Sequence, residues 1–110
     1  MDNAINELFI HIGEDFRQWR SRSDNFDPES VGEFIDNLYA VDGRSYIKIV
    51  KTLGTQEMVW GFIVKEDGPK FRAGDILKAA SWRKPARNKA RGNILDGDFS
   101  MVRWGGPEYL

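Results

Sequence analysis

A run of positive charge with a tryptophan inside it is the feature of this sequence best suited to binding chemistry. Between residues 78 and 91 there are six Lys or Arg side chains and no acid, although the whole chain has a formal net charge of −1. Lys and Arg release condensed counterions when they meet phosphates, and an indole ring can stack on an exposed base. The segment therefore predicts a nucleic-acid-binding loop, with DNA and RNA not distinguished. The predicted contact residues are Lys78, Trp82, Arg83, Lys84, Arg87, Lys89 and Arg91.

Each member of this segment has an expected role. Five cations, Arg83, Lys84, Arg87, Lys89 and Arg91, are expected to meet phosphates, and Lys78 is expected at the edge of the site. Trp82 is predicted either to stack on a base or to bury its ring and anchor the loop, and Trp104 lies in the same half of the sequence. The competing interpretation is a solvated loop whose charges face water or pair with acids elsewhere.

Charge is divided unevenly along the chain. Residues 1–43 carry ten acids against three Arg, a balance of −7, whereas the remainder carries thirteen Lys or Arg against seven acids, a balance of +6. Because summed charge decides what a surface attracts, the second part should draw anionic partners. The alternative is a protein–protein interaction module that uses either the aromatic-rich sheet or the acidic helices, which would dock on a basic protein. The acids of that helical face are Glu7, Glu14, Asp15, Asp24, Asp27, Glu29, Glu33 and Asp36.

Catalytic and metal-binding patterns are weak. The chain has no Cys, which excludes disulfides, thiolate catalysis and Cys-based metal sites. The single histidine, His11, lies beside an apolar helical stripe and is expected at the boundary of the core. Asp96 and Asp98 flank Gly97 as in a tight turn, and two acids fall short of a calcium loop. We therefore expect a protein that binds rather than catalyses, with no cofactor and no metal. A carboxylate-dependent enzyme or a small-ligand binder built on the sheet is the third alternative.

Two helices are expected at the start of the chain. Apolar residues recur every three or four positions from about Asp2 or Asn3 to Arg20, which predicts an amphipathic helix. Asp27 and Pro28 have the character of an N-cap and a first helical residue, so a second helix is predicted from there to about Tyr39.

After Gly43 the apolar period changes to two, which indicates strands. Tyr46–Lys51 and Met58–Lys65 are predicted strands, and residues 53–56 are expected to join them as a hairpin. The second strand has two apolar faces, as expected of an interior strand. Met58, Trp60, Phe62 and Val64 are expected to share one of those faces. Phe71–Ala80 and Phe99–Trp104 are further strand candidates. The predicted fold is α+β: two helices packed on a four- to five-stranded antiparallel sheet or a small SH3-like barrel.

Two resemblances accompany these patterns. Residues 71–77 are similar to the turn-and-strand entry of small SH3-like barrels. The stretches Lys78–Trp82, Ala90–Ile94 and Trp104–Leu110 resemble small uncharacterised proteins of tailed bacteriophages. This second resemblance implies a host protein as a partner and the host cytoplasm as the location.

Length and hydropathy set the remaining expectations. A chain of 110 residues suits one domain, with an acidic helical part at 1–40 and a basic β part at 44–110. The sequence shows no secretory leader and no apolar run of the roughly 18 residues that a membrane span needs. We expect a cytoplasmic protein without membrane contact, and the sequence leaves its oligomeric state open.

Overall fold

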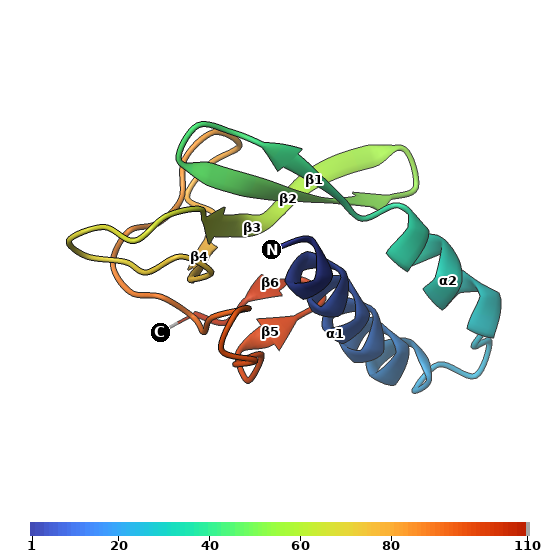
Figure 1. Cartoon of the computed structure of the whole chain (residues 1–110). Coiled ribbons are helices and arrows are strands. Elements are labelled where there is room, and N and C mark those ends of the chain that lie inside the picture. Colours follow the sequence, from blue (N-terminus) through green and yellow to red (C-terminus); the bar gives the residue numbers. More distant parts are fainter. Residues whose placement is uncertain (110) are drawn as a thin grey trace.

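The computed structural model describes residues 1–109 and has an α+β architecture, as predicted (Figure 1). Two helices are followed by a four-stranded antiparallel sheet in the order β1-β2-β3-β4 and by a small two-stranded sheet, β5-β6. The described residues form no closed barrel, so the SH3-like alternative is wrong. The elements are α1 (Asp2–Arg20), α2 (Pro28–Asp36), β1 (Tyr39–Asp42), β2 (Tyr46–Leu53), β3 (Gln56–Val64), β4 (Ile76–Lys78), β5 (Val102–Arg103) and β6 (Gly106–Pro107).

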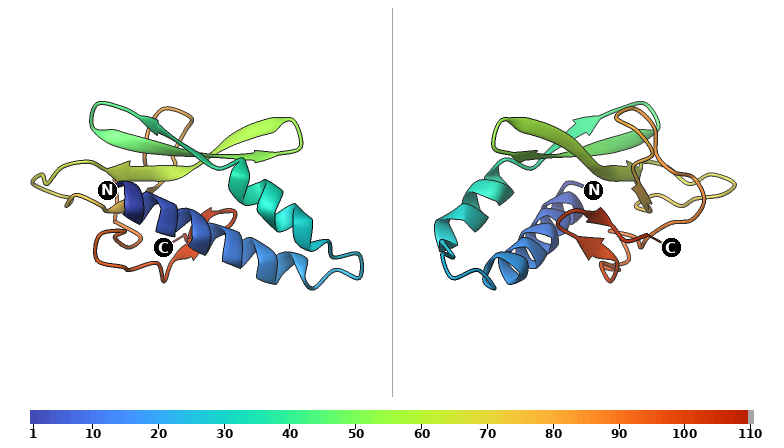
Figure 2. Two further views of the ribbon diagram at one scale, coloured as in Figure 1. Left: turned by 45° about the vertical axis from the view of Figure 1, so that its right-hand side comes forward. Right: turned by 180° about the vertical axis from the view of Figure 1, so that it is seen from behind.

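The helices lie against one face of the sheet, and both begin where the sequence predicts (Figures 1 and 2). Asp27 caps α2, since its carboxylate accepts the amide hydrogen of Glu29 at 3.0 Å. The second helix is shorter than predicted: it ends at Asp36, and Tyr39 begins β1 instead. Leu38 turns into the core at this point, and residues 39–42 pair with β2. Backbone pairing with a neighbouring strand thus overrides the helical spacing.

The interior position of β3, between β2 and β4, is confirmed. The expected alternation along it fails at one place, because the register between β2 and β3 shifts so that Ile49 pairs with Gly61 and Val50 with Val59. The extra residue is Trp60, and a bulge of this kind turns the following side chains to the other face. Trp60 consequently packs toward the helices with Ile63, whereas Phe62 packs on the opposite, outer face.

The sheet separates a larger core from a smaller one. Side chains from both helices, four strands (β2, β3, β4 and β5) and the later loops build the larger core, which includes Leu8, Phe34, Ile49, Trp60 and Ile94. The outer face carries the smaller cluster of Phe62, Val64, Phe71 and Leu77. The outer face is therefore covered by loops and side chains, not by helices, and it is where the predicted binding segment lies.

Two of the predicted strands are much shorter in the structure. Of residues 71–80 only Ile76–Lys78 form a strand, because a turn precedes it: the Asp75 carboxylate accepts the Arg72 amide hydrogen at 2.8 Å and Gly74 has φ +90°. Of residues 99–104 only Val102 and Arg103 form β5, which pairs with β6 and not with the main sheet. The predicted turn at residues 96–98 is confirmed, with Gly97 at φ +72°.

Candidate nucleic-acid interface

The basic segment forms a closed loop with a neck and a tip. It leaves β4 at Lys78 and returns beside the same strand, where Arg91 N–H donates to Ile76 O at 2.7 Å and Ile76 N–H donates to Gly92 O at 3.0 Å. Ala86 N–H closes the neck further by donating to Lys78 O at 2.7 Å. We call residues 79–90 the basic loop, and Lys78 with Arg91 its neck. The backbone pairing gives the loop a fixed base on the sheet.

The tip of the basic loop is a tight turn around Ser81. The Ser81 hydroxyl accepts the amide hydrogens of Arg83 and Lys84, at 3.3 and 3.2 Å. The Lys84 carbonyl accepts the amide hydrogens of Ala80 and Ser81. Trp82 at this tip is 47% exposed, with the Lys48 ammonium 4.5 Å from its ring centroid. The structure thus leaves the indole accessible and holds it against β2. The exposed cations of the loop are Arg83, Lys84, Arg87 and Lys89.

The two neck cations are engaged inside the protein, unlike those of the tip. Arg91 is only 2% exposed, and its guanidinium donates to Asn88 Oδ1 at 2.9 Å, Lys89 O at 2.8 Å and Glu108 O at 3.3 Å. Lys78 donates to Pro107 O at 2.7 Å and lies 3.9 Å from the ring centroid of Tyr109. The expected phosphate contact of Arg91 is therefore contradicted by its burial, and Lys78 is occupied by the C-terminal segment.

Lys51 of β2 is a third cation that contacts the C-terminal segment, together with the two neck cations. It is 6% exposed, donates to Gly105 O at 2.9 Å and lies 5.2 Å from the ring centroid of Trp104. Burial, with added repulsion from Lys78, lowers the pKa of Lys51. Burial also lowers the pKa of Lys78, with added repulsion from Arg91. These three cations hold residues 105–108 through main-chain carbonyls.

A cationic hollow lies on the outer face between the turn that joins β1 to β2 and the basic loop. Its volume is about 380 Å³, and its cations come from three places: Arg44 in the turn, Lys48 on β2 and Arg83 at the loop tip. No acidic residue among those the structure describes lines it. Tyr46 and Phe62 form its apolar wall. The loop tip and the turn stand side by side there (Figures 1 and 2).

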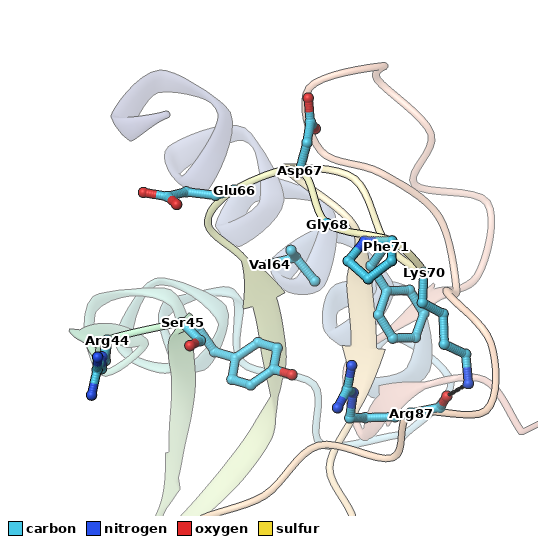
Figure 3. A pocket seen from close by; sticks show the side chains of 11 residues that line it. Arg44, Ser45, Val64, Glu66, Asp67, Gly68, Lys70, Phe71 and Arg87 are labelled. Carbon is cyan, nitrogen blue, oxygen red and sulfur yellow. Dashed lines mark hydrogen bonds between the residues drawn. The ribbon is translucent and has the colours of Figure 1, made fainter.

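An aromatic hollow of about 240 Å³ shares the wall formed by residues 44–46 (Figure 3). Phe71 and Val64 lie on its inner side, and the Arg87 guanidinium points toward them. The side chains of Glu66 and Asp67 point outward from the rim. Lys70 donates to the Arg87 carbonyl, which ties the loop between β3 and β4 to the basic loop.

Sequence reasoning missed the cations that complete this surface, namely Arg44, Lys48 and Lys70, and the aromatic residue Tyr46. Each is isolated in the sequence among neutral or acidic neighbours. A usable signal existed for Lys48 and Tyr46, which alternate with Ile47 and Ile49 on a predicted strand and therefore face away from the helices. Bringing the others to the site requires the packing of three separate segments.

Other candidate residues lie away from this surface. Trp104 packs with the helices, 5.5 Å from Phe16 and 4.7 Å from Trp19 between ring centroids, so it does not join Trp82. His11 is exposed and stacks on Phe99 at 4.1 Å, rather than lying at the core boundary. Within residues 1–109, no three His, Asp or Glu side chains come together as metal ligands. No helix in this part of the chain has the length and apolar character to cross a membrane.

Comparison of the sequence with protein families finds one whose sequence model matches residues 2–106, from the start of α1 to β6. The chain belongs to DUF7717, a family of unknown function. The DUF7717 match includes the basic loop, its neck and both hollows, whereas Pro107, Glu108 and Tyr109, which contact the neck cations, lie just beyond the matched residues. No curated protein and no solved structure matches the chain.

Proposed function

We propose that this DUF7717 protein binds single-stranded nucleic acid across the outer face of its sheet. The observation that carries the proposal is the convergence of Arg44, Lys48 and Arg83 around a hollow without acids, beside the half-exposed Trp82. Cations from three segments at one place match the spaced charges of a phosphate backbone. An accessible indole at the same place matches a base that is not stacked within a duplex.

The slightly negative net charge of the chain is consistent with this proposal, because most of the acids lie away from the outer face. Ten of the seventeen Asp and Glu residues lie in residues 1–43, most of them on or beside the two helices. The helices cover the opposite face of the sheet, so their charge is directed away from the outer face (Figure 1). A net charge of −1 is therefore compatible with a cationic binding face.

Fluorescence anisotropy tests the proposal with labelled single-stranded DNA, single-stranded RNA and duplex DNA, each titrated at two salt concentrations. We expect a single strand to bind more tightly than duplex and its affinity to fall as salt rises. Arg83→Ala with Lys84→Ala should weaken binding about equally across sequences and flatten the salt dependence, because phosphate contacts carry no base identity.

The matched control is Arg17→Ala with Arg22→Ala, which also removes two positive charges. Both residues are exposed, one in the last turn of α1 and the other just after the helix. It should leave the salt slope unchanged. Absence of binding to any of the three probes at low salt, where charge attraction is strongest, would refute the proposal.

A second candidate function is protein binding through the acidic helices. Its specific support is Trp19, which is 47% exposed on α1 in a part of the chain rich in exposed acids. Half-exposed tryptophans are frequent anchors of protein interfaces. The resemblance to tailed-phage proteins would make the partner a host factor. A stoichiometric partner that survives nuclease treatment in a pull-down, and is lost in Trp19→Ala, would favour this function.

A further inference from the structure

The two hollows on the outer face differ in chemistry. The cationic hollow is lined by three cations and no described acid, so it favours the phosphates of a bound strand. The aromatic hollow is smaller, about 240 Å³, and its lining is mixed, since it has three cations, two acids whose side chains point outward from the rim, and two aromatic rings. The cationic hollow therefore offers a phosphate the more uniformly positive surface. The aromatic hollow is the better match for the ring of a nucleotide.

The lining of the aromatic hollow fits a planar ring. Tyr46 and Phe71 contribute aromatic side chains and Val64 an apolar inner surface. The ring centroid of Phe71 is 5.9 Å from the Arg87 guanidinium carbon and 5.5 Å from the Lys70 nitrogen. Phe71 is only 8% exposed and forms the floor of the hollow, so the partly exposed Tyr46 offers the ring on which a base can stack. Arg87 has hydrogen-bond donors for the ring nitrogens and carbonyl oxygens of a base.

We propose that the aromatic hollow takes one unstacked nucleobase of a strand whose phosphates lie over the cationic hollow. This inference rests on the proposed function and adds a base-contacting site to it. The shared wall of residues 44–46 makes the two hollows adjacent, as a base and its own backbone must be. Tyr46, Phe71 and Arg87 are then base-contacting residues, whereas Arg44, Lys48 and Arg83 contact the backbone.

Ultraviolet crosslinking with a single strand that carries photoreactive thiouracil bases, followed by mass spectrometry of the peptides, tests this assignment. Crosslinks form from the base itself, so we expect them on Tyr46, Phe71 or Arg87 as well as on Trp82. Crosslinks confined to Trp82 and its neighbours would overturn the base site while leaving strand binding intact.

An affinity measurement gives a second, independent readout. The wild-type protein should bind an oligonucleotide more tightly than the same backbone with abasic positions throughout. Tyr46→Leu keeps an apolar side chain against Phe62 and should reduce that preference by about tenfold, the amount expected for one stacked base. Its affinity for the abasic strand should not change.

The outcomes separate the two proposals. If Tyr46→Leu prefers the strand with bases over the abasic strand as strongly as the wild type does, the base site is refuted, even though both strands still bind. Failure of both strands to bind the wild type at low salt would refute the proposed function and the base site together. Circular dichroism of Tyr46→Leu confirms that the variant is folded before its affinity is interpreted.

Discussion

The neck and the tip of the basic loop contain the same kinds of residue in opposite surroundings. Arg91 in the neck is 2% exposed and donates to three oxygens of the protein, whereas Arg83 at the tip is exposed beside a hollow. Lys78 and Lys51 resemble Arg91, since each donates to a carbonyl of the C-terminal segment. One run of charge in the sequence thus divides into structural cations and cations available to a ligand.

The difference shows why charge density along a sequence is an incomplete guide to a binding site. A buried cation costs free energy unless protein acceptors replace its water, and the neck meets this requirement with main-chain carbonyls. The tip cations Arg83 and Lys84 are exposed instead, so water can solvate them. Removing a neck cation should therefore act on stability, and removing a tip residue should act on binding.

The largest expected effect is that of Arg91→Ala. The substitution leaves the carbonyls of Lys89 and Glu108 without their side-chain donor, removes one of the two donors to Asn88 Oδ1, and opens a gap in the neck. We expect the free energy of unfolding to fall by about 3 kcal/mol. Urea denaturation followed by tryptophan fluorescence measures it. The control Lys89→Ala, which removes an exposed charge two residues away, should stay within about 0.5 kcal/mol of wild type. A similar fall in the free energy of unfolding in both variants would show that the neck cation is no more important for stability than an exposed cation of the loop.

Trp82→Ala should have the next largest effect, on affinity for a single strand. Loss of one stacking surface is expected to weaken binding about tenfold in an anisotropy titration. Stability should change little because the side chain is half exposed. Trp19→Ala is a closely matched control, since Trp19 has the same exposed fraction of 47% but lies on α1. Should Trp19→Ala weaken strand binding as much, the binding surface would have to include the helices.

The smallest expected effect is a change in the pH dependence of stability in Lys51→Met. Burial lowers the pKa of Lys51 in the folded protein below its ordinary value of 10.5. Between the lowered pKa and 10.5 the unfolded chain binds more protons than the folded one, so stability contributed by this group rises with pH. Below the lowered pKa the burial cost is present in full. In the variant, the free energy of unfolding should not show this rise at alkaline pH. Urea denaturation at a series of pH values measures it. An identical pH profile in the two proteins would show that Lys51 is not buried as a charged group.

Much of the fold was predictable because it depends on local periodicity. The apolar stripe of α1, the Asp27-Pro28 start of α2 and the β2–β3 hairpin all follow from spacing and turn residues within short windows. The errors occur where tertiary pairing competes with local preference. Tyr39 continues a helical spacing yet pairs with Val50, and Trp60 follows an alternation that a bulge breaks.

The candidate site was predictable only in part. The charge run identified Trp82, Arg83, Lys84, Arg87 and Lys89, which are exposed in the structure. Exposure is a property of the packed molecule, so the sequence did not separate these residues from Lys78 and Arg91. Arg44, Lys48 and Lys70 join the surface only because the β1–β2 turn, β2 and the β3–β4 loop meet there.

The sequence by itself determined the helices, the central hairpin, the division of charge and the presence of a basic loop, because each depends on residues close together in the chain. Tertiary structure alone decided which cations are buried against the C-terminal segment and which surround the two hollows. The physical reason is that burial and convergence depend on contacts between distant segments. The hydrogen bond from Arg91 to Glu108, and the position of Arg44 and Arg83 around one hollow, follow only from the packed sheet.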